Sequence, residues 1–322
     1  MRVESLSNWI KKSLPIALDY RKNRAGNKRK SSIINTYPPF PNEMVLFGPA
    51  GIPLSCKGRT LKDGIRLIRD LELDAIEIQL LRGVEIKEDV AEIRGLAKDL
   101  DIRLSIHAPY YTSLVSSNQA LAKRSMNNIL ATGLLADELG ANVVVAHPGF
   151  YEGVERVDEA LKIATSNVVR LKMLWDERGV KAAIGLELSG KRNVFGTLDE
   201  IITVCKKVEG VVPVINFAHL HARTGGSLRA KDDFGAVLGR VENELPIKEF
   251  YTHFTGVYYE DEDELYHVPI KKGDLRFEPL AECILEKGYD VTVISESPIL
   301  EHDAVYMRIL TERVARAKGI ND

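Results

Sequence analysis

The fold is constrained most by a regular alternation of short apolar runs with segments of helical periodicity, which begins at Met44 and continues almost to the last residue. Most of the apolar runs are rich in β-branched residues and lack the polar–apolar alternation of a half-exposed strand, which is typical of buried parallel strands. The eight runs cover residues 44–48, 74–78, 102–107, 142–147, 182–188, 211–216, 247–254 and 291–296. We expect each run to form a strand.

Segments in which apolar residues recur with the period of an α-helix follow these runs. They cover residues 60–71, 88–100, 118–140, 157–179, 197–208, 234–245, 277–288 and 302–318. Several end in a glycine after a charged last turn, as at Gly140, Gly179 and Gly288, which is a normal helix stop. Eight strands alternating with eight helices in about 280 residues match a (β/α)8 TIM barrel in count and size. The sequence therefore predicts an α/β TIM barrel over residues 44–322, with a doubly wound open sheet as the alternative.

Residues 1–43 differ from this pattern, because they contain nine Lys and Arg residues against three acidic ones. Residues 5–20 could form one short amphipathic helix, and the basic segment after it has the composition of a disordered linker. We expect a basic, flexible N-terminal extension. Two alternatives are an arm that contacts the DNA backbone and a protein that starts at Met44.

The formal net charge of −2 gives the chain no overall basic field for nucleic acid or membrane binding. An anionic partner would have to be bound by a local basic patch or by metal ions. The three cysteines are far apart and form no CxxC motif, which favours buried thiols in a reducing compartment. The sequence also lacks an 18-residue apolar run and the apolar core of a signal peptide. We expect a cytoplasmic monomer without a membrane partner or an obligate protein partner.

Histidines and carboxylates gather where the predicted strands end, which is where TIM barrels place their active sites. The strands end at His107, His147, Glu187, Asn216, His253 and Glu296, and His219, His221 and His267 lie in the segments that follow. A single histidine after a strand is usually a hydrogen-bonded loop residue. However, a barrel brings all the strand ends to one rim, where so many imidazole and carboxylate groups need a cation to organise them. These ligands suit zinc, with manganese or iron as alternatives.

The chain resembles endonuclease IV, the zinc-dependent apurinic/apyrimidinic endonuclease of the wider xylose-isomerase-like barrel group. The resemblance spans about residues 44 to 318. It is carried by HAPYYTSL, AHPG, LELSGK, NFAH, THFTG, YHVPIKKGD and ISESP, in this order and at matching strand ends. It implies a centre of three zinc ions.

The resemblance assigns the first metal to His107, His147 and Glu187. It also implies that Glu187 bridges to a second metal, which His253 and Glu296 hold as well.

Two departures from the family weaken the rest of the centre. The family has an aspartate where this chain has Asn216, whose oxygen can bind a cation but brings no charge, so the second metal should bind more weakly. The third metal is assigned to His219 and His267, but the family's remaining ligand, an aspartate, is replaced here by Leu265, which cannot bind a metal. Residues that could substitute are Glu260, Asp263, Glu264 and His221. We therefore expect one complete zinc site, a weakened second site and an incomplete third.

The predicted function is metal-assisted hydrolysis of the phosphodiester on the 5′ side of abasic sites in DNA, a base excision repair activity. Two neighbouring metals would clamp the phosphate, with Glu187 as the bridging ligand and Glu296 orienting the attacking hydroxide. Tyr110 and Tyr111 stand where the family inserts side chains into the DNA stack, although packing at the rim is the alternative. Lys191 could contact a phosphate, with ordinary surface charge as the alternative.

A sugar isomerase or epimerase on the same barrel is the rival prediction. Such enzymes bind one divalent metal in a pattern that Glu187, Asn216, His253 and Glu296 would occupy, and the two glutamates would act as the acid–base pair. This reading gives no metal role to the remaining histidines, which are His107, His147, His219 and His267. A non-catalytic, degenerate homologue is a third alternative, because Asn216 and Leu265 both depart from the family.

Overall fold

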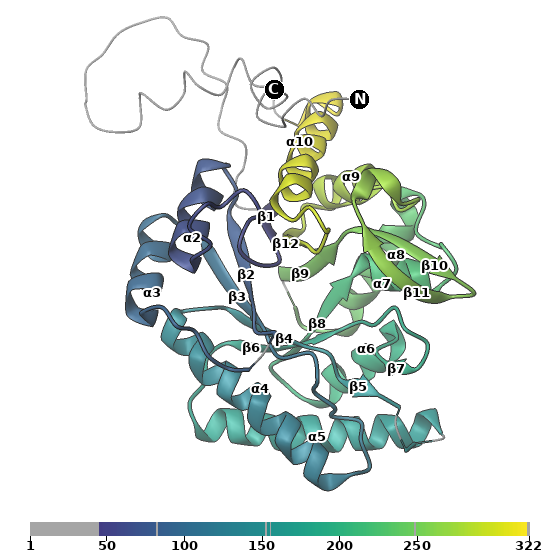
Figure 1. The fold of residues 1–322 in the computed structure, drawn as a ribbon. Coiled ribbons are helices and arrows are strands. Elements are labelled where there is room, and N and C mark those ends of the chain that lie inside the picture. Colours follow the sequence, from purple (N-terminus) through teal and green to yellow (C-terminus); the bar gives the residue numbers. More distant parts are fainter. Residues whose placement is uncertain (1–44, 82, 152, 155, 248, 321–322) are drawn as a thin grey trace, which may run out of the picture. The chain divides into compact units, whose positions relative to one another are not determined.

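The computed structural model describes residues 45–320 except 82, 152, 155 and 248. The predicted N-terminal extension, residues 1–43, lies outside the described residues. The described chain forms an eight-stranded parallel sheet that curls into a barrel with helices around it (Figure 1). The order of the strands is β1 (Val45–Pro49), β12 (Asp290–Ser295), β9 (Glu249–Phe254), β8 (Val211–Asn216), β6 (Ala183–Glu187), β4 (Val143–Ala146), β3 (Arg103–His107) and β2 (Ala75–Gln79).

The two outer strands of this order, β1 and β2, meet and nearly close the barrel. A parallel bridge joins Ala50 to Glu77, and the backbone N–H of Asp74 donates to the carbonyl of Phe47 at 2.9 Å. Gly48 allows this approach, since a Cβ at this position would lie 2.0 Å from the carbonyl oxygen of Ala75. The predicted TIM barrel is confirmed, and the open-sheet alternative is wrong.

The eight predicted helices are all present. They are α2 (Leu61–Asp70), α3 (Val90–Asp99), α4 (Gln119–Leu139), α5 (Val157–Glu177), α6 (Leu198–Lys207), α8 (Lys231–Glu244), α9 (Glu278–Lys287) and α10 (Glu301–Ala317). The predicted stops at Gly140 and Gly288 are left-handed C-caps with φ of 73° and 67°. At the N-terminus of α6, Thr197 and Glu200 form a reciprocal capping box.

Two apolar clusters fill the molecule on the two faces of the sheet. Ile76 and Val144 belong to the larger cluster, which includes most buried helix residues. The smaller cluster contains Ala75, Val145, Val214, Tyr251 and Ile294, all from strands. Because successive side chains of a strand point to opposite faces, the smaller cluster fills the barrel interior. The hydroxyl of Tyr251 donates to Glu77 at 2.9 Å, so this interior becomes polar beside the apolar cluster.

Additional elements lie in the loops between the strands and the barrel helices. They are the antiparallel pair β5 (Gly149–Phe150) and β7 (Val194–Phe195), the short helix α7 (Phe217–Arg223), the hairpin β10 (Gly256–Glu260) and β11 (Asp263–Val268), and the 3-10 turn η2 (Ile270–Lys272). The segment after β9 is therefore an ordered hairpin, which packs beside α7 (Figure 1).

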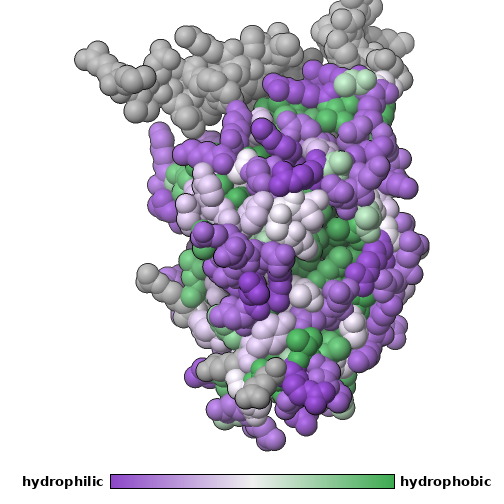
Figure 2. Space-filling view, turned by 90° about the vertical axis from the view of Figure 1, so that its right-hand side faces the viewer, coloured by the Kyte–Doolittle hydropathy of each residue, from purple (hydrophilic) through white to green (hydrophobic). Residues whose placement is uncertain are grey.

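Within the described part of the chain, each helix is either too short or too polar to cross a membrane. The face drawn in Figure 2 mixes hydrophilic and hydrophobic residues, and its green areas are broken up by purple ones.

Candidate metal centre

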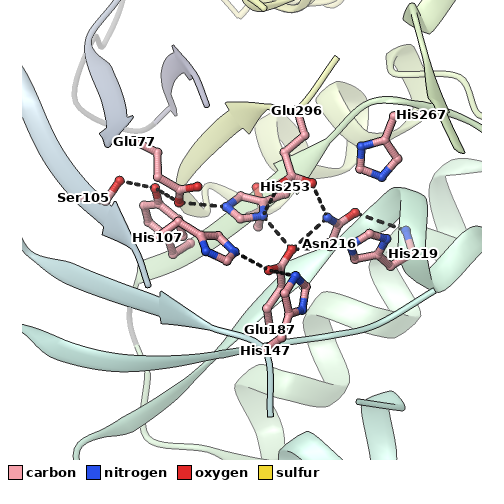
Figure 3. A network of polar contacts seen from close by, with 12 residues as sticks. Glu77, Ser105, His107, His147, Glu187, Asn216, His219, His253, His267 and Glu296 are labelled. Atoms are coloured by element: carbon pink, nitrogen blue, oxygen red, sulfur yellow. Dashed lines mark hydrogen bonds and ion pairs between the residues drawn. The ribbon is translucent and has the colours of Figure 1, made fainter. Parts of the chain in front are cut away.

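The strand ends converge as the sequence predicts, and the polar side chains from them point into one shared space (Figure 3). His107 ends β3 and Glu187 ends β6, while His253 lies near the end of β9. The fully buried members of the cluster are Glu77, His107, Glu187, Asn216 and His253. Charged and imidazole groups this far from water must be paired or bound to a cation.

The three residues predicted for the first metal lie together. Nε2 of His107 and Nε2 of His147 lie 3.2 Å and 3.1 Å from the same oxygen, Oε2 of Glu187. Nδ1 of His107 lies 2.7 Å from the carbonyl of Ala108, which can only accept, so Nδ1 carries the proton and Nε2 is left to face the site. Two imidazole nitrogens and a carboxylate oxygen within 4.8 Å of one another form a donor set that fits zinc.

Electrostatics favour the metal-binding forms of two ligands of this first site, Glu187 and His147. Burial lowers the pKa of His147 to about 4, so its imidazole is neutral at pH 7. Burial alone would raise the pKa of Glu187, but His147, His253 and His107 together hold this pKa well below its usual value. Glu187 is therefore an ionised ligand beside a neutral imidazole.

A second three-residue site lies beside the first and includes residues of the hairpin. It stands where the sequence predicts the third metal and is called the second site from here on. Nδ1 of His219 contacts Oε2 of Glu264, and Nε2 of His267 lies 3.3 Å from Oε1 of the same glutamate. Nε2 of His267 is buried without a hydrogen bond of normal geometry among the described residues, as expected of an atom that a cation would bind. His219, Glu264 and His267 thus also fit a metal ion.

Of the four residues that could replace the ligand lost at Leu265, the structure brings Glu264 to this site. Asp263 accepts a hydrogen bond from the backbone of Arg192 at 2.7 Å. His221 is turned toward Asp274, with 3.1 Å between Nε2 and the carboxylate. A β-bulge in the hairpin shifts its register, and bulges of this kind re-aim side chains.

Asn216 lies between the two sites, with its amide in a defined orientation. Nδ2 donates to Oε1 of Glu187 at 2.9 Å and to Oε2 of Glu296 at 2.6 Å. Oδ1 accepts from the backbone N–H of His219 at 3.1 Å and so caps α7. A metal ligand would have to turn its oxygen toward the carboxylates, so this orientation differs from the one that the predicted role requires.

Glu77 is a member of the cluster that the sequence analysis did not include. Its Oε2 lies 2.9 Å from Nε2 of His253, whose Nδ1 lies 2.8 Å from Oε1 of Glu187. Burial alone would lower the pKa of His253, but the charges of Glu77, Glu296 and Glu187 raise it well above its usual value. An acidic residue in the otherwise apolar stretch 75–78 is the signal that could have identified Glu77.

The predicted substrate-binding residues have different surroundings. Tyr110 stacks on the ring of His107, with 4.4 Å between ring centroids, and its hydroxyl donates to Gln79 at 2.9 Å. Tyr111 is exposed. Lys191 donates from Nζ to the backbone carbonyl of Glu264 and so holds the hairpin, which leaves this amine already engaged within the protein.

A cavity of about 680 Å³ opens onto the centre. Its polar side includes Tyr110, His147, Glu264, His267 and Glu296, and its apolar side includes Ile52, Leu80, Leu81 and Leu300, with Arg59 at the lining. This volume and mixed lining suit a group of small-molecule or nucleotide size.

Comparison with known proteins finds a family and a relative of this chain. The profile of a family described as the xylose isomerase-like TIM barrel matches residues 65–310. A protein of Methanocaldococcus jannaschii described as uncharacterized is 30% identical over 269 residues, which cover 82% of this chain and 96% of the relative.

Two of the similar solved structures represent different activities. A D-tagatose 3-epimerase-like protein has a TM-score of 0.64 at 23% identity, and the match covers 80% of this chain and 94% of the other. Endonuclease IV from Thermus thermophilus has the same TM-score of 0.64 at 16% identity, with 85% and 99% covered. At these identities both likenesses show the fold, and the choice of chemistry depends on the site.

Proposed function

The chain belongs to the xylose isomerase-like TIM barrel family. Because its rim brings together overlapping His/Glu groups that could hold metal ions, among them the adjoining His107/His147/Glu187 and His219/Glu264/His267 sites, we propose that it is a zinc-dependent phosphodiesterase. Its substrate would be DNA with abasic sites, cut on the 5′ side of the lesion. The proposal goes beyond the shared fold and depends on the donor sets at the rim.

The observation that carries the proposal is the closeness of the two three-residue sites. Nε2 of His219 lies 3.6 Å from Oε1 of Glu187, and the rings of His147 and His219 are 5.9 Å apart. Cations in both sites would be neighbours, as a two-metal phosphodiesterase needs in order to hold the attacking and leaving oxygens. A one-metal isomerase would leave His107, His147 and His267 without a metal role.

Zinc bound at these sites would polarise the phosphate and lower the pKa of a bound water. The protein supplies the rest. Glu187 and His147 present an anionic and a neutral donor to the first metal, while Glu296 lines the cavity where it can orient the attacking water. Tyr110, fixed by its stack on His107, borders the same cavity. The cavity is large enough for an extruded abasic sugar, which is cheap to unstack because it has no base.

Bound metals would also explain how a chain without an overall positive charge could bind a phosphate. The formal net charge of the chain is −2, so phosphate must be attracted locally rather than by the whole molecule. Bound divalent cations are the largest local charges in such a site and would neutralise the phosphate. Arg59, in the lining of the cavity, adds one further positive group.

A sugar epimerase or isomerase is the second candidate, favoured by the cavity itself. A volume of about 680 Å³ with an apolar side resembles a small-molecule pocket. An epimerase-like structure also matches as well as endonuclease IV does, at a TM-score of 0.64. In this candidate Glu187 and Glu296 would transfer the proton beside a carbonyl.

The deciding experiment incubates the zinc-loaded protein with an end-labelled duplex that contains one abasic site. We expect a nick on the 5′ side of the lesion and none in an undamaged duplex. Glu187→Gln keeps the shape of the side chain but removes its charge, and it is the matched inactive control. An intact duplex together with interconversion of a ketose and an aldose, or of two epimeric ketoses, by the same preparation would establish the isomerase or the epimerase instead. A zinc-loaded protein that does neither would be the non-catalytic homologue.

A further inference from the structure

We propose that the side-chain amide of Asn216 occupies the place of a cation between Glu187 and Glu296, so that the centre binds two metal ions, one on each side of this amide, and none at Asn216 itself. The proposal rests on the metal centre of the proposed function but not on its substrate. It changes the expected role of Asn216 from a weak metal ligand to a replacement for the metal.

The orientation of the amide is fixed from both of its ends. Oδ1 accepts from the backbone N–H of His219, one of the first N–H groups of α7, which have no partner within the helix. Nδ2 donates to both carboxylates, at 2.9 Å from Glu187 and 2.6 Å from Glu296. Turning the amide over would place its NH2 against an N–H and its oxygen against two carboxylate oxygens. All three hydrogen bonds would be lost in a fully buried position.

An aspartate at position 216 could cap α7 and bind a cation at the same time. A carboxylate has two acceptor oxygens, so one could cap α7 while the other bound a cation. Asparagine has a single acceptor oxygen, and in this structure the cap already uses it. An aspartate would also place three carboxylates in contact, which repel one another unless a cation lies between them. Glu187, Glu296 and His219 lie close enough together to share an ion, and on this proposal the residue at position 216 decides whether that space holds one.

The two carboxylate oxygens of Glu187 also have separate roles, since one faces the first metal site and the other accepts from nitrogens of the protein. Oε2 faces the first metal site, with Nε2 of His107 at 3.2 Å and Nε2 of His147 at 3.1 Å. Oε1 faces the protein's own nitrogens, with Nδ2 of Asn216 at 2.9 Å and Nδ1 of His253 at 2.8 Å (Figure 3). Two nitrogens of the chain thus surround the oxygen that would otherwise bridge to a central metal.

The test is the metal content of the wild-type protein and of Asn216→Asp. Both are saturated with zinc, freed of unbound metal by gel filtration and measured by mass spectrometry. We expect two zinc ions per wild-type chain and three per Asn216→Asp chain. Asn243→Asp, which adds the same charge on the exposed face of α8, is the matched control and should keep two.

Anomalous diffraction at the zinc edge locates the ions. Wild-type crystals should show peaks at His107/His147/Glu187 and at His219/Glu264/His267. Asn216→Asp crystals should add a peak between Glu187 and Glu296. A wild-type peak against Asn216, or an unchanged metal content in Asn216→Asp, would overturn the proposal. The wild-type measurement alone decides the matter if the variant does not fold.

The metal count is separate from the proposed activity, because no DNA is present. Two zinc ions in a protein that does not nick abasic DNA would contradict the function and leave the role of Asn216 standing. Three zinc ions in a wild-type protein that nicks DNA would do the reverse.

Discussion

Single residues of the centre are oriented by hydrogen bonds of the side-chain atoms that face away from the metal site. His107 is the clearest case, because the carbonyl of Ala108 holds its Nδ1 and thereby aims Nε2 at Oε2 of Glu187. The ring is also stacked against Tyr110 and fully buried. The neighbours that enclose this ring also fix the direction in which Nε2 faces Glu187.

His107→Ala should therefore lose the first zinc and the activity together. Loss of a residue that only orients a metal ligand weakens binding by about 10–100-fold, so loss of the ligand itself should exceed about 100-fold. Zinc titration with a competing chelator measures the affinity, and the nicking assay measures the activity. His302→Ala makes the same chemical change at the start of α10, at a residue outside the candidate metal groups, and should change neither. Full zinc content in His107→Ala would remove this residue from the centre.

The strand-end residues could be predicted from the sequence because their position follows from the barrel alone. An apolar run predicts a strand, and the residue that ends it must lie at the rim, as His107 and Glu187 do. Glu77 could not be found in this way, because it lies within β2 rather than at its end. The orientation of the Asn216 amide was also beyond the sequence, since it depends on which partners the fold brings to each end of the side chain.

At the scale of elements, the hairpin of β10 and β11 completes the second metal site, because it contributes both Glu264 and His267. It is fastened to the loop after β6. The backbone N–H of Glu264 donates to Gly190 at 3.0 Å, and Lys191 donates to the carbonyl of Glu264. The second site thus depends on a contact between two loops, whereas the first is built on the rigid ends of strands.

Lys191→Met should weaken zinc binding at the second site by roughly tenfold, about 1.4 kcal/mol, and leave the first site unchanged. Methionine keeps most of the aliphatic length but cannot donate to Glu264. A two-step zinc titration followed by calorimetry would show whether only one step shifts. Lys207→Met, on an exposed lysine at the end of α6, is the control. If both steps remain unchanged while DNA binding becomes weaker, Lys191 contacts phosphate as the sequence predicts.

The hairpin was less predictable than the barrel elements. The acidic segment 260–264 offers several equivalent carboxylates, and its amino-acid order does not reveal the bulge beside Tyr258 that sets their register. Helix α7 was hidden for a different reason, because its seven residues follow β8 without an intervening loop. The barrel strands and helices are determined by long stretches with a regular apolar period. The hairpin and α7 are shorter, and their structure depends on the residues that the fold packs against them.

The whole molecule is organised by the closure of its sheet, which brings β1 and β2, at opposite ends of the strand order, together. Gly48 lies at this contact, where a side chain would overlap the carbonyl of Ala75. Closure also determines where Glu77 lies, because the residue that pairs with Ala50 through its backbone holds His253 with its side chain. The overall fold and the metal centre are therefore coupled at one residue.

Gly48→Ala should destabilise the protein by about 3 kcal/mol, since a methyl group at 2.0 Å from backbone forces the two strands apart. Urea unfolding followed by circular dichroism measures the change. Gly95→Ala, in the interior of α3 with nothing within 4 Å of the added carbon, should instead stabilise by about 0.5–1 kcal/mol. Equal stabilities of the two variants would mean that β1 and β2 do not approach so closely.

The meeting of β1 and β2 also bears on the motions of the barrel. The described contact consists of one bridge between Ala50 and Glu77 and of the bonds between Phe47 and Asp74, whereas β1 and β12 pair along five residues. Segments with few backbone bonds open at the lowest free energy. Local opening of the barrel should therefore occur mainly between β1 and β2. Each opening would move Glu77 away from His253. Fluctuations of the barrel would thus affect the metal centre through the carboxylate of Glu77.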